Sequence, residues 1–267
     1  MNNFKKELSI IIVNYNGEYY LENCLDSIYK YCSSIRFEII VVDNNSSDKS
    51  VSTIKEKYPE VNLIESKENL GFARGNNLAA KEAKGDCFLL LNNDTILLDH
   101  LKPVLNLITT DNTIGVVGIK MLDRNEIYKK SVGNFPKIIS LLFFSKLFKN
   151  KKGFEKGNFT ENKLEVDWIE GSFLFLKKEL YTKINGFAED YFMYVEDVDL
   201  CKKIALQGKK RVFLPNLSYI HYGGFNKSKQ HLLIEGYLIY VAKYFGRLKF
   251  VGIIILKIKK IIFKFIK

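Results

Sequence analysis

The chain has 267 residues, 47% of them hydrophobic, and carries a formal net charge of +11 at pH 7. This length suits one large domain, or one domain with an appendage, and the hydrophobic fraction excludes an intrinsically disordered chain. The excess of positive charge predicts an acidic partner, such as a phosphorylated substrate, an anionic lipid or a nucleic acid. None of the cysteines has C-x-x-C spacing, so we expect reduced structural thiols at Cys24, Cys32, Cys87 and Cys201.

The first 118 residues alternate short apolar runs with helical patterns. The apolar runs predict buried strands at residues 8–13, 37–42, 61–64, 87–91 and 114–118. Helical periodicity fills the intervals between them, as in a series of βαβ units. This alternation predicts an α/β fold with a mostly parallel central sheet flanked by helices.

Polar side chains follow two of the predicted strands. Asp43 follows the second strand, and Asn92, Asn93 and Asp94 follow the fourth. Ligands of an open parallel sheet bind beyond the carboxyl ends of its strands, so we expect Asp43 and Asp94 to flank one crevice. A carboxylate beside amide oxygens offers hard ligands for Mg²⁺ or Mn²⁺, which often bind phosphates as well. A simple polar turn is the alternative interpretation of residues 92–94.

A second acidic cluster, Glu196, Asp197 and Asp199, stands at the start of a predicted helix. One hypothesis is that a member of this cluster is a general base for a hydroxyl nucleophile. The alternative is that these carboxylates only complement the helix dipole. His221 ends a predicted strand, and this position distinguishes it from the other two histidines.

Six ordered motifs resemble those of family 2 glycosyltransferases, and most of all the rhamnosyltransferase-like bacterial members. They are residues 11–16 (IIVNYN), 41–48 (VVDNNSSD), 69–76 (NLGFARGN), 90–94 (LLNND), 196–200 (EDVDL) and His221. The resemblance spans roughly residues 7–225. It implies a GT-A fold and an inverting transfer of a sugar from a nucleotide-diphosphate donor, such as a dTDP- or UDP-sugar.

The resemblance also implies roles for residues at matching positions. Asp43 matches the aspartate that binds base and ribose, Asp94 the metal-binding aspartate of the D-x-D motif, and Asp197 the catalytic base. His221 matches a histidine that completes the metal site in some members, so the implied cofactor is a divalent cation, Mg²⁺ or Mn²⁺. Asn92 stands where the motif often has its first Asp, and the missing charge predicts weaker metal binding.

The expected donor and acceptor sites include further residues. The donor set is Asn14, Asn16, Asp43, Asn45, Gly71, Arg74, Asn76, Asn93 and Asp94. The acceptor set is Trp168, Gly171, Ser172, Glu196 and Asp199. An aromatic platform for a sugar and a core aromatic are both open interpretations of Trp168.

Three other classes of protein are weighed against this one. A nucleotidyltransferase should have a glycine-rich basic loop after the first strand, and a nicotinamide or flavin enzyme should have G-x-G-x-x-G there. The chain has NYNG at residues 14–17 instead. The non-enzyme alternative is an inactive module that binds membrane or nucleic acid, which the presence of Asp94, Asp197 and His221 disfavours.

We expect two parts in the chain. Residues 1–228 form the glycosyltransferase domain, with a nucleotide-binding half at about 7–118 and an acceptor and catalytic half at about 119–228. Residues 229–267 form a basic helical tail. We expect the catalytic core to fold without the part of this tail that follows about residue 241. The oligomeric state is left open.

The tail has the pattern of a basic amphipathic helix. Residues 241–267 contain eight Lys or Arg and no Asp or Glu. One helical face carries Lys257, Lys260, Lys264 and Lys267, and the other carries Ile254, Ile258, Ile261, Ile262 and Phe265. This pattern is typical of a helix that lies on an anionic membrane, and an intramolecular or dimer-packing helix is the alternative. The apolar-basic stretch at residues 137–152 is a second candidate contact.

These features predict a location as well as partners. Residues 1–7 lack the apolar core of a signal peptide, and no run approaches the ~18 apolar residues of a membrane span. We therefore expect a cytoplasmic enzyme, peripheral on the inner face of the cell membrane, with a lipid-linked saccharide acceptor and no nucleic-acid partner.

Overall fold

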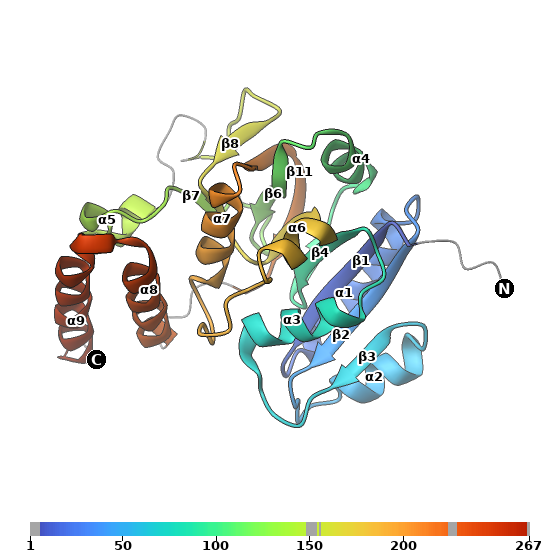
Figure 1. Cartoon of the computed structure of the whole chain (residues 1–267). Helices are drawn as coiled ribbons and strands as arrows, with labels where there is room; N and C mark the ends of the chain where they lie inside the picture. Colours follow the sequence, from blue (N-terminus) through green and yellow to red (C-terminus); the bar gives the residue numbers. More distant parts are fainter. Residues whose placement is uncertain (1–5, 148–153, 155, 224–228, 266–267) are drawn as a thin grey trace.

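The structure, a computed structural model, describes residues 6–147, 154, 156–223 and 229–265. A mixed central sheet is flanked by helices, and the C-terminal helices stand together at one end of the molecule (Figure 1). The main sheet contains β1 (Leu8–Asn14), β2 (Phe37–Asp43), β3 (Asn62–Glu65), β4 (Cys87–Asn92), β5 (Thr95–Leu97), β6 (Ile114–Leu122), β8 (Leu164–Val166), β10 (Phe173–Lys177) and β11 (Lys210–His221). A separate pair is formed by β7 (Val132–Gly133) and β9 (Trp168–Ile169).

The helices fall between these strands and after the last one. They are α1 (Glu18–Tyr31), α2 (Ser50–Lys57), α3 (Gly71–Glu82), α4 (Lys102–Thr110), α5 (Ile138–Leu142), α6 (Lys178–Lys183), α7 (Glu196–Leu206), α8 (Gln230–Tyr244) and α9 (Lys249–Phe265). Two short 3₁₀ helices are η1 (Phe144–Leu147) and η3 (Gly246–Leu248).

The N-terminal half forms the parallel sheet that the apolar runs predict. Strands β3, β2, β1 and β4 lie side by side in parallel. Asn14 pairs with Asp43, and Val13 pairs with Asn92, so the three strands end at the same edge of the sheet. The register therefore places Asn14, Asp43 and Asn92 next to one another, beyond the carboxyl ends where ligands bind.

The second half makes the sheet mixed. Strand β10 lies between β4 and β6 and runs antiparallel to both. The long strand β11 runs parallel to β6 and antiparallel to β5, with a break in register between Leu214 and Ser218. Pro215 lies within this break, and it has no N–H to donate to a neighbouring strand. At the end of β11, His221 pairs with Thr95, which directly follows Asp94.

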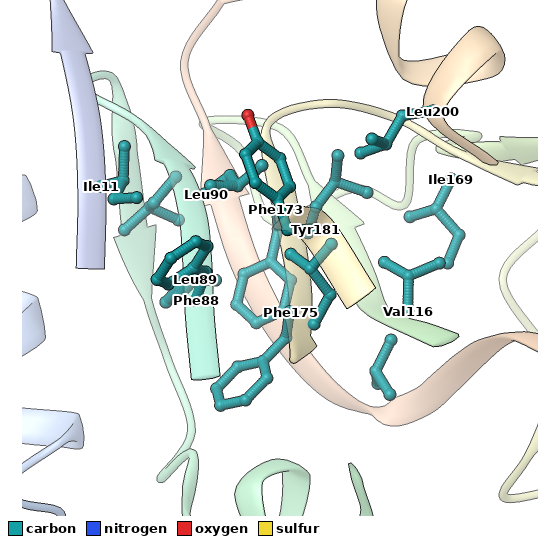
Figure 2. Packing of buried hydrophobic residues seen from close by; sticks show 14 of the residues in the cluster. Ile11, Phe88, Leu89, Leu90, Val116, Ile169, Phe173, Phe175, Tyr181 and Leu200 are labelled. Carbon is teal, nitrogen blue, oxygen red and sulfur yellow. The ribbon is translucent and has the colours of Figure 1, made fainter. Parts of the chain in front are cut away.

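The core fills the space between the central strands and the helices. Figure 2 shows Leu89 and Phe88 of β4, Phe173 and Phe175 of β10 and Tyr181 of α6 among its members. The rings of Phe88 and Tyr181 meet edge to face, with centroids 5.6 Å apart. All four cysteines are buried free thiols, as their spacing predicts.

Helix α8 packs into the same core. Its residues Ile234, Tyr237, Tyr240 and Val241 are all buried. The hydroxyl of Tyr244 donates to the buried carboxylate of Asp199 in α7, at 3.0 Å. α8 is therefore packed against α7 and the turn before it, which help to cover its apolar side chains.

Helix α9 packs on α8 and α5 through one face only. A methyl group added at Gly252 would lie 2.8 Å from Val241 of α8 and 3.2 Å from Leu141 of α5. Leu256 on this face is fully buried, whereas Ile254 and Ile258 on the opposite face are more than half exposed. α9 is thus amphipathic with an uncovered apolar face.

The predicted lysine face of α9 is only partly described. Lys257 is exposed and Lys260 forms an ion pair with Glu235 of α8. The side chains of Lys264 and Phe265, and the whole of Lys267, lie outside the described part of the chain, as do residues 148–152 of the second candidate membrane contact. Among the described helices, none is both long enough and apolar enough to cross a membrane.

Candidate active site

A cavity of about 810 Å³ lies beyond the ends of β4, β9 and β11. It brings together residues that are far apart in the sequence and that the motifs singled out. From the predicted sets it is lined by Asn92, Asp94, Trp168, Gly171, Ser172, Glu196, Asp197 and His221. The predicted metal, acceptor and base residues therefore share one space.

Asp94 and His221 form the first cluster in this cavity. Oδ1 of Asp94 lies 3.2 Å from Nε2 of His221, and the Asn92 amide nitrogen lies 3.3 Å from the same ring nitrogen. Gly223 leaves the room for this arrangement, since a methyl group there would collide with the Asp94 carboxylate. Burial by itself lowers the pKa of His221, but the carboxylates of Glu170 and Asp94 raise it to about 9.

The Asp94–His221 cluster fits a divalent cation, but it supplies only a few of the ligands that such a cation needs. Oδ1 of Asp94 is buried and faces Nε2 of His221 at 3.2 Å. A buried carboxylate oxygen facing an imidazole nitrogen suits a metal ion, which would take the place of the imidazolium proton. Within the described residues, no group of three or more His, Cys, Asp or Glu is arranged to hold a metal. Most of the coordination would thus have to come from a bound diphosphate and water.

Asp197 stands near the start of α7, and its carboxylate faces the cavity. Its Oδ2 accepts a hydrogen bond from the backbone N–H of Gly171 at 2.9 Å, and Oδ1 accepts one from Val198 at 2.8 Å. Burial and the negative charge of Glu170 raise the pKa of Asp197 to about 7, against the opposing effect of these two backbone donors. A carboxylate with this pKa is well matched to general-base catalysis near neutral pH.

Glu196 is the more buried neighbour of Asp197. Its Oε2 has no hydrogen-bond partner within the described part of the chain. Burial and the adjacent charge of Asp197 raise the pKa of Glu196 well above its usual range. Glu196 is therefore harder to ionise than an ordinary glutamate, and Asp197, held by two backbone donors, is the better candidate for a base.

Glu170 belongs to the same cavity and is absent from the predicted sets. Its Oε2 accepts a hydrogen bond from Ser172 at 3.0 Å, and its Oε1 lies 3.7 Å from Nδ1 of His221. The Ser172 hydroxyl is also 2.6 Å from that of Tyr219. Glu170 lies between Trp168 and Gly171, which are both predicted acceptor residues. Its position as a charged residue at the end of an apolar strand is the sequence signal that could have identified it.

The turn before α7 is strained. Tyr194 and Val195 have φ angles of 72° and 73°, a left-handed conformation that is rare for a β-branched residue. Helix α8 covers this turn so closely that a methyl group at Gly236 would lie 2.6 Å from the Tyr194 carbonyl oxygen. Strain of this kind persists where the surrounding packing enforces it, and here it sets the position of Asp197.

The predicted donor-side residues Asn14, Asp43 and Asn93 form a hydrogen-bonded chain. The Asn93 amide donates to Asn14 at 2.7 Å, and the Asn14 amide donates to Asp43 at 3.0 Å. The other Asp43 oxygen accepts the backbone N–H of Ser46 at 2.9 Å. Gly17 permits this packing, because a methyl group there would collide with both asparagines. Asp43 is thus buried and shapes the loop after β2.

Two other predicted donor residues shape the same loops. Asn16 has a φ of 51°, and its side-chain oxygen accepts the backbone N–H of Ser47 at 2.8 Å. Asn45 has a φ of 64° and is exposed. Asparagine tolerates the left-handed region better than most residues, which accounts for its use at both turns.

The remaining predicted donor residues lie on α3, outside the cavity lining. Gly71 has a φ of 76° and packs against Phe192, where a side chain would collide with the carbonyl oxygen. Asn76 is buried and donates to the Phe72 carbonyl within the helix. Arg74 lines a separate surface hollow that also contains Glu189 and Asp190.

Asp199, predicted as an acceptor-binding residue, is turned away from the cavity. It is fully buried and accepts hydrogen bonds from Tyr191 at 3.2 Å and Tyr244 at 3.0 Å. Residues two apart on a helix are rotated by about 200°, so Asp197 and Asp199 face opposite ways. Trp168 is largely buried, and its indole N–H donates to the Asn134 carbonyl at 3.0 Å, although it contributes to the cavity wall.

Comparison with solved structures identifies the fold. The chain resembles GalNAc-T7, which was crystallised with UDP, GalNAc and Mn²⁺. The TM-score is 0.70 and the sequences are 18% identical, and the match covers 93% of this chain and 50% of GalNAc-T7. It also resembles the mannosyltransferase PcManGT of Pyrobaculum calidifontis in complex with GDP-Man and Mn²⁺, with a TM-score of 0.63, 20% identity and coverage of 96% and 70%. The fold is that of the GT-A glycosyltransferases.

Sequence comparison identifies the family. Residues 9–182 match the sequence model of glycosyl transferase family 2, and the chain belongs to this family. Its relatives include the rhamnosyltransferase WbbL of Escherichia coli K12, 28% identical over 80% of this chain and 82% of that protein. The N-acetylglucosaminyl-diphospho-decaprenol L-rhamnosyltransferase of Mycobacterium tuberculosis is 24% identical over 80% of this chain and 76% of its own length. The predicted fold and family are both confirmed.

The packing of α8 on the strained turn generates a first prediction. Gly236→Ala places a methyl group against Tyr194 and Val195, so the turn must move and take Asp197 with it. We expect kcat to fall about tenfold or more with donor binding unchanged, since a shift of 1 Å at the site is costly. Gly252→Ala, at a similar contact on α9, is the matched control. Equal turnover in both variants would contradict a role of α8 in placing Asp197.

Proposed function

We propose that the chain is an inverting glycosyltransferase that moves a rhamnosyl or related deoxyhexosyl group from a nucleotide-diphosphate donor to a hydroxyl of a lipid-linked saccharide in cell-surface polysaccharide synthesis. The observation that carries this proposal is the single cavity holding both Asp197, with its pKa near 7, and the Asp94–His221 pair. Sugar transfer requires a base for the acceptor hydroxyl and groups that bind the leaving diphosphate, and both must face the same cavity.

Asp197 is the proposed general base. As the acceptor hydroxyl attacks the anomeric carbon, its proton passes to the Asp197 carboxylate, while the bond between sugar and diphosphate breaks. The backbone N–H groups of Gly171 and Val198 hold the carboxylate in place during the step. Direct displacement requires the attacking hydroxyl and the leaving diphosphate on opposite faces of the sugar, so the configuration at that carbon inverts.

Asp94 and His221 are the proposed protein ligands of a divalent cation. The cation would stabilise the negative charge that develops on the departing diphosphate. Asn92 adds no charge to this site, so affinity for the cation depends on the donor diphosphate more than in a site with two carboxylates. Two structural neighbours were solved with Mn²⁺ and a nucleotide or nucleotide sugar, which supports the same arrangement here.

The choice of substrates follows from the relatives. Two of them carry rhamnosyltransferase names, and the name of the mycobacterial one specifies a diphospho-decaprenol acceptor. The hydrogen-bonded chain of Asn93, Asn14 and Asp43 shapes the loops beside the cavity, where the nucleotide of a dTDP- or UDP-sugar would lie.

The base role leads to a test in solution. Asp197→Asn keeps the shape of the side chain and loses its basicity, so we expect kcat to fall about 10²-fold or more with donor affinity nearly unchanged. In the wild type, kcat/KM should fall below pH 7 as Asp197, with its pKa of about 7, becomes protonated. Asp111→Asn, at a partly exposed aspartate outside the cavity, is the control. Near-normal turnover of Asp197→Asn would shift the role to Glu196.

The metal role is tested separately by calorimetry of Mn²⁺ binding in the presence of UDP. Asp94→Asn should weaken binding at least about tenfold, and His221→Ala less, because Asp94 supplies a charge and His221 a neutral ligand. Wild-type affinity should rise with pH up to about 9, since the cation must displace the His221 proton. Unchanged affinity in both variants would place the cation elsewhere.

We further propose that the enzyme is peripheral on the inner face of the cell membrane. The uncovered face of α9 presents large apolar side chains to solvent, namely Phe250, Val251, Ile254, Ile258, Ile261 and Ile262. Lys257 and Lys260 flank this face, and α9 contains no acidic residue. Basic residues near an anionic surface contribute about 1 kcal/mol each, and the apolar side chains add to this by burial.

Liposome co-sedimentation tests this location. Replacing both Ile254 and Ile258 with serine should abolish most binding to anionic vesicles, and added salt should weaken the remaining electrostatic part. The matched control replaces Ile127 and Leu206, which are also exposed, with serine. A wild-type protein that ignores anionic vesicles, or a control that loses binding equally, would contradict the membrane role of α9.

A further inference from the structure

The cavity has walls of different chemistry. Its acidic side is formed by Asp94, Glu170, Glu196 and Asp197. The wall formed by η1 and α8 is apolar, and it consists of Phe144, Leu147, Leu233 and Tyr237. The rings of Phe144 and Tyr237 lie 5.4 Å apart and join the two elements into one surface. A saccharide and a nucleotide are both polar, so neither makes full use of this apolar wall.

The apolar wall continues to the outside of the protein. Directly before Phe144, the side chains of Ile139, Leu142 and Phe143 are 48%, 44% and 56% exposed. Ile139 and Leu142 belong to α5, which Phe143 directly follows, and α5 contacts α9 and lies beside the α8–α9 pair in Figure 1. Contiguous exposed apolar side chains of this kind mark interaction sites. An apolar path thus runs from the cavity to the surface that carries α9.

Positive charges accompany this path. The Lys259 ammonium lies 4.3 Å from the centre of the Phe144 ring, and the Lys146 ammonium lies 5.4 Å from that of Phe143. Lys130 and Lys229 also line the cavity. Residues 137–147 contain no acidic residue. Cations beside an apolar path are complementary to a ligand that joins a phosphate group to a hydrocarbon chain.

We infer that the apolar wall is the binding site for the first isoprenoid units of a lipid diphosphate acceptor, with the lysines facing its phosphates. The inference rests on the proposed function, because it takes the lipid-linked acceptor from there. Beyond that function, we infer that the cavity binds the lipid part of the acceptor directly, and that this contact is separate from any anchoring of the enzyme by α9. The lipid would then orient the acceptor sugar toward Asp197, and remote binding of this kind lowers the KM of lipid-bearing acceptors.

The only tryptophan of the chain gives a direct measurement. Trp168 lines the cavity, and a methyl group added at Gly133 would collide with both its ring and the Leu147 carbonyl oxygen. Geranyl diphosphate should therefore change the Trp168 fluorescence in a saturable way. Inorganic diphosphate has the phosphates without the hydrocarbon chain, and geraniol has the chain without the phosphates. Each should bind at least about tenfold more weakly than geranyl diphosphate. Equal binding of inorganic and geranyl diphosphate would overturn the inference.

Variants locate the binding site. Phe144→Ser and Leu233→Ser, on two different elements, should each weaken geranyl diphosphate binding about tenfold and leave Mn²⁺–UDP binding unchanged. Leu206→Ser, an exposed leucine on α7, is the matched control, and replacing both Ile254 and Ile258 with serine separates the wall from the membrane face of α9. Circular dichroism confirms folding of each variant. Wild-type affinity in both wall variants would overturn the inference.

The experiment distinguishes this inference from the function on which it rests. Binding is measured without turnover, so geranyl diphosphate can bind the wall in a protein that transfers no sugar, and that result would contradict only the proposed function. Transfer to a lipid-free acceptor with the same KM as to a lipid-bearing one would contradict only the role of the wall.

Discussion

The gathering of carboxylates around one partly enclosed cavity is the constraint on which the rest of this structure depends. Burial raises the pKa values of Glu196 and Asp197 because a charged group loses its solvation, and the negative charge of a neighbouring carboxylate raises them further. The charge of His221 and the backbone donors Gly171 and Val198 offset part of this cost. Repulsion between Glu170 and Asp197 would otherwise push the two groups apart, so the surrounding scaffold has to hold them.

The C-terminal helices supply part of that scaffold. The strained turn before Asp197 lies against Gly236 of α8, and the same helix ends at Tyr244, which donates to the buried Asp199. α9 in turn packs on α8 with one face and leaves its apolar face uncovered. In the proposed function, the helix that holds the catalytic turn is therefore the neighbour of the helix that contacts lipid. In that proposal, the packing of α8 on α9 joins the helix beside Asp197 to the helix that contacts lipid.

Much of the site could be predicted from the sequence, because strand ends follow a simple rule. Apolar runs that end abruptly in polar residues identified Asp94 and His221 as strand-end groups, and both line the cavity. Glu170 is absent from the predicted sets because its partner His221 is distant in the sequence and lies beside it only in the folded structure. Asp199 was grouped with Asp197 by proximity in the chain, although a separation of two residues on a helix places them on opposite faces.

The sequence by itself determined the kind of most elements in the first 118 residues and in the tail, because periodicity of apolar residues reflects local burial. It also determined the order of the motifs and the charge asymmetry of the last 27 residues, from 241 to 267. Only the tertiary structure decided that β10 lies antiparallel between β4 and β6, that β11 returns beside β5 to bring His221 to Asp94, and that α8 is buried. These pairings join segments many residues apart, and their stability comes from the packing of the whole core, which no local pattern of residues contains.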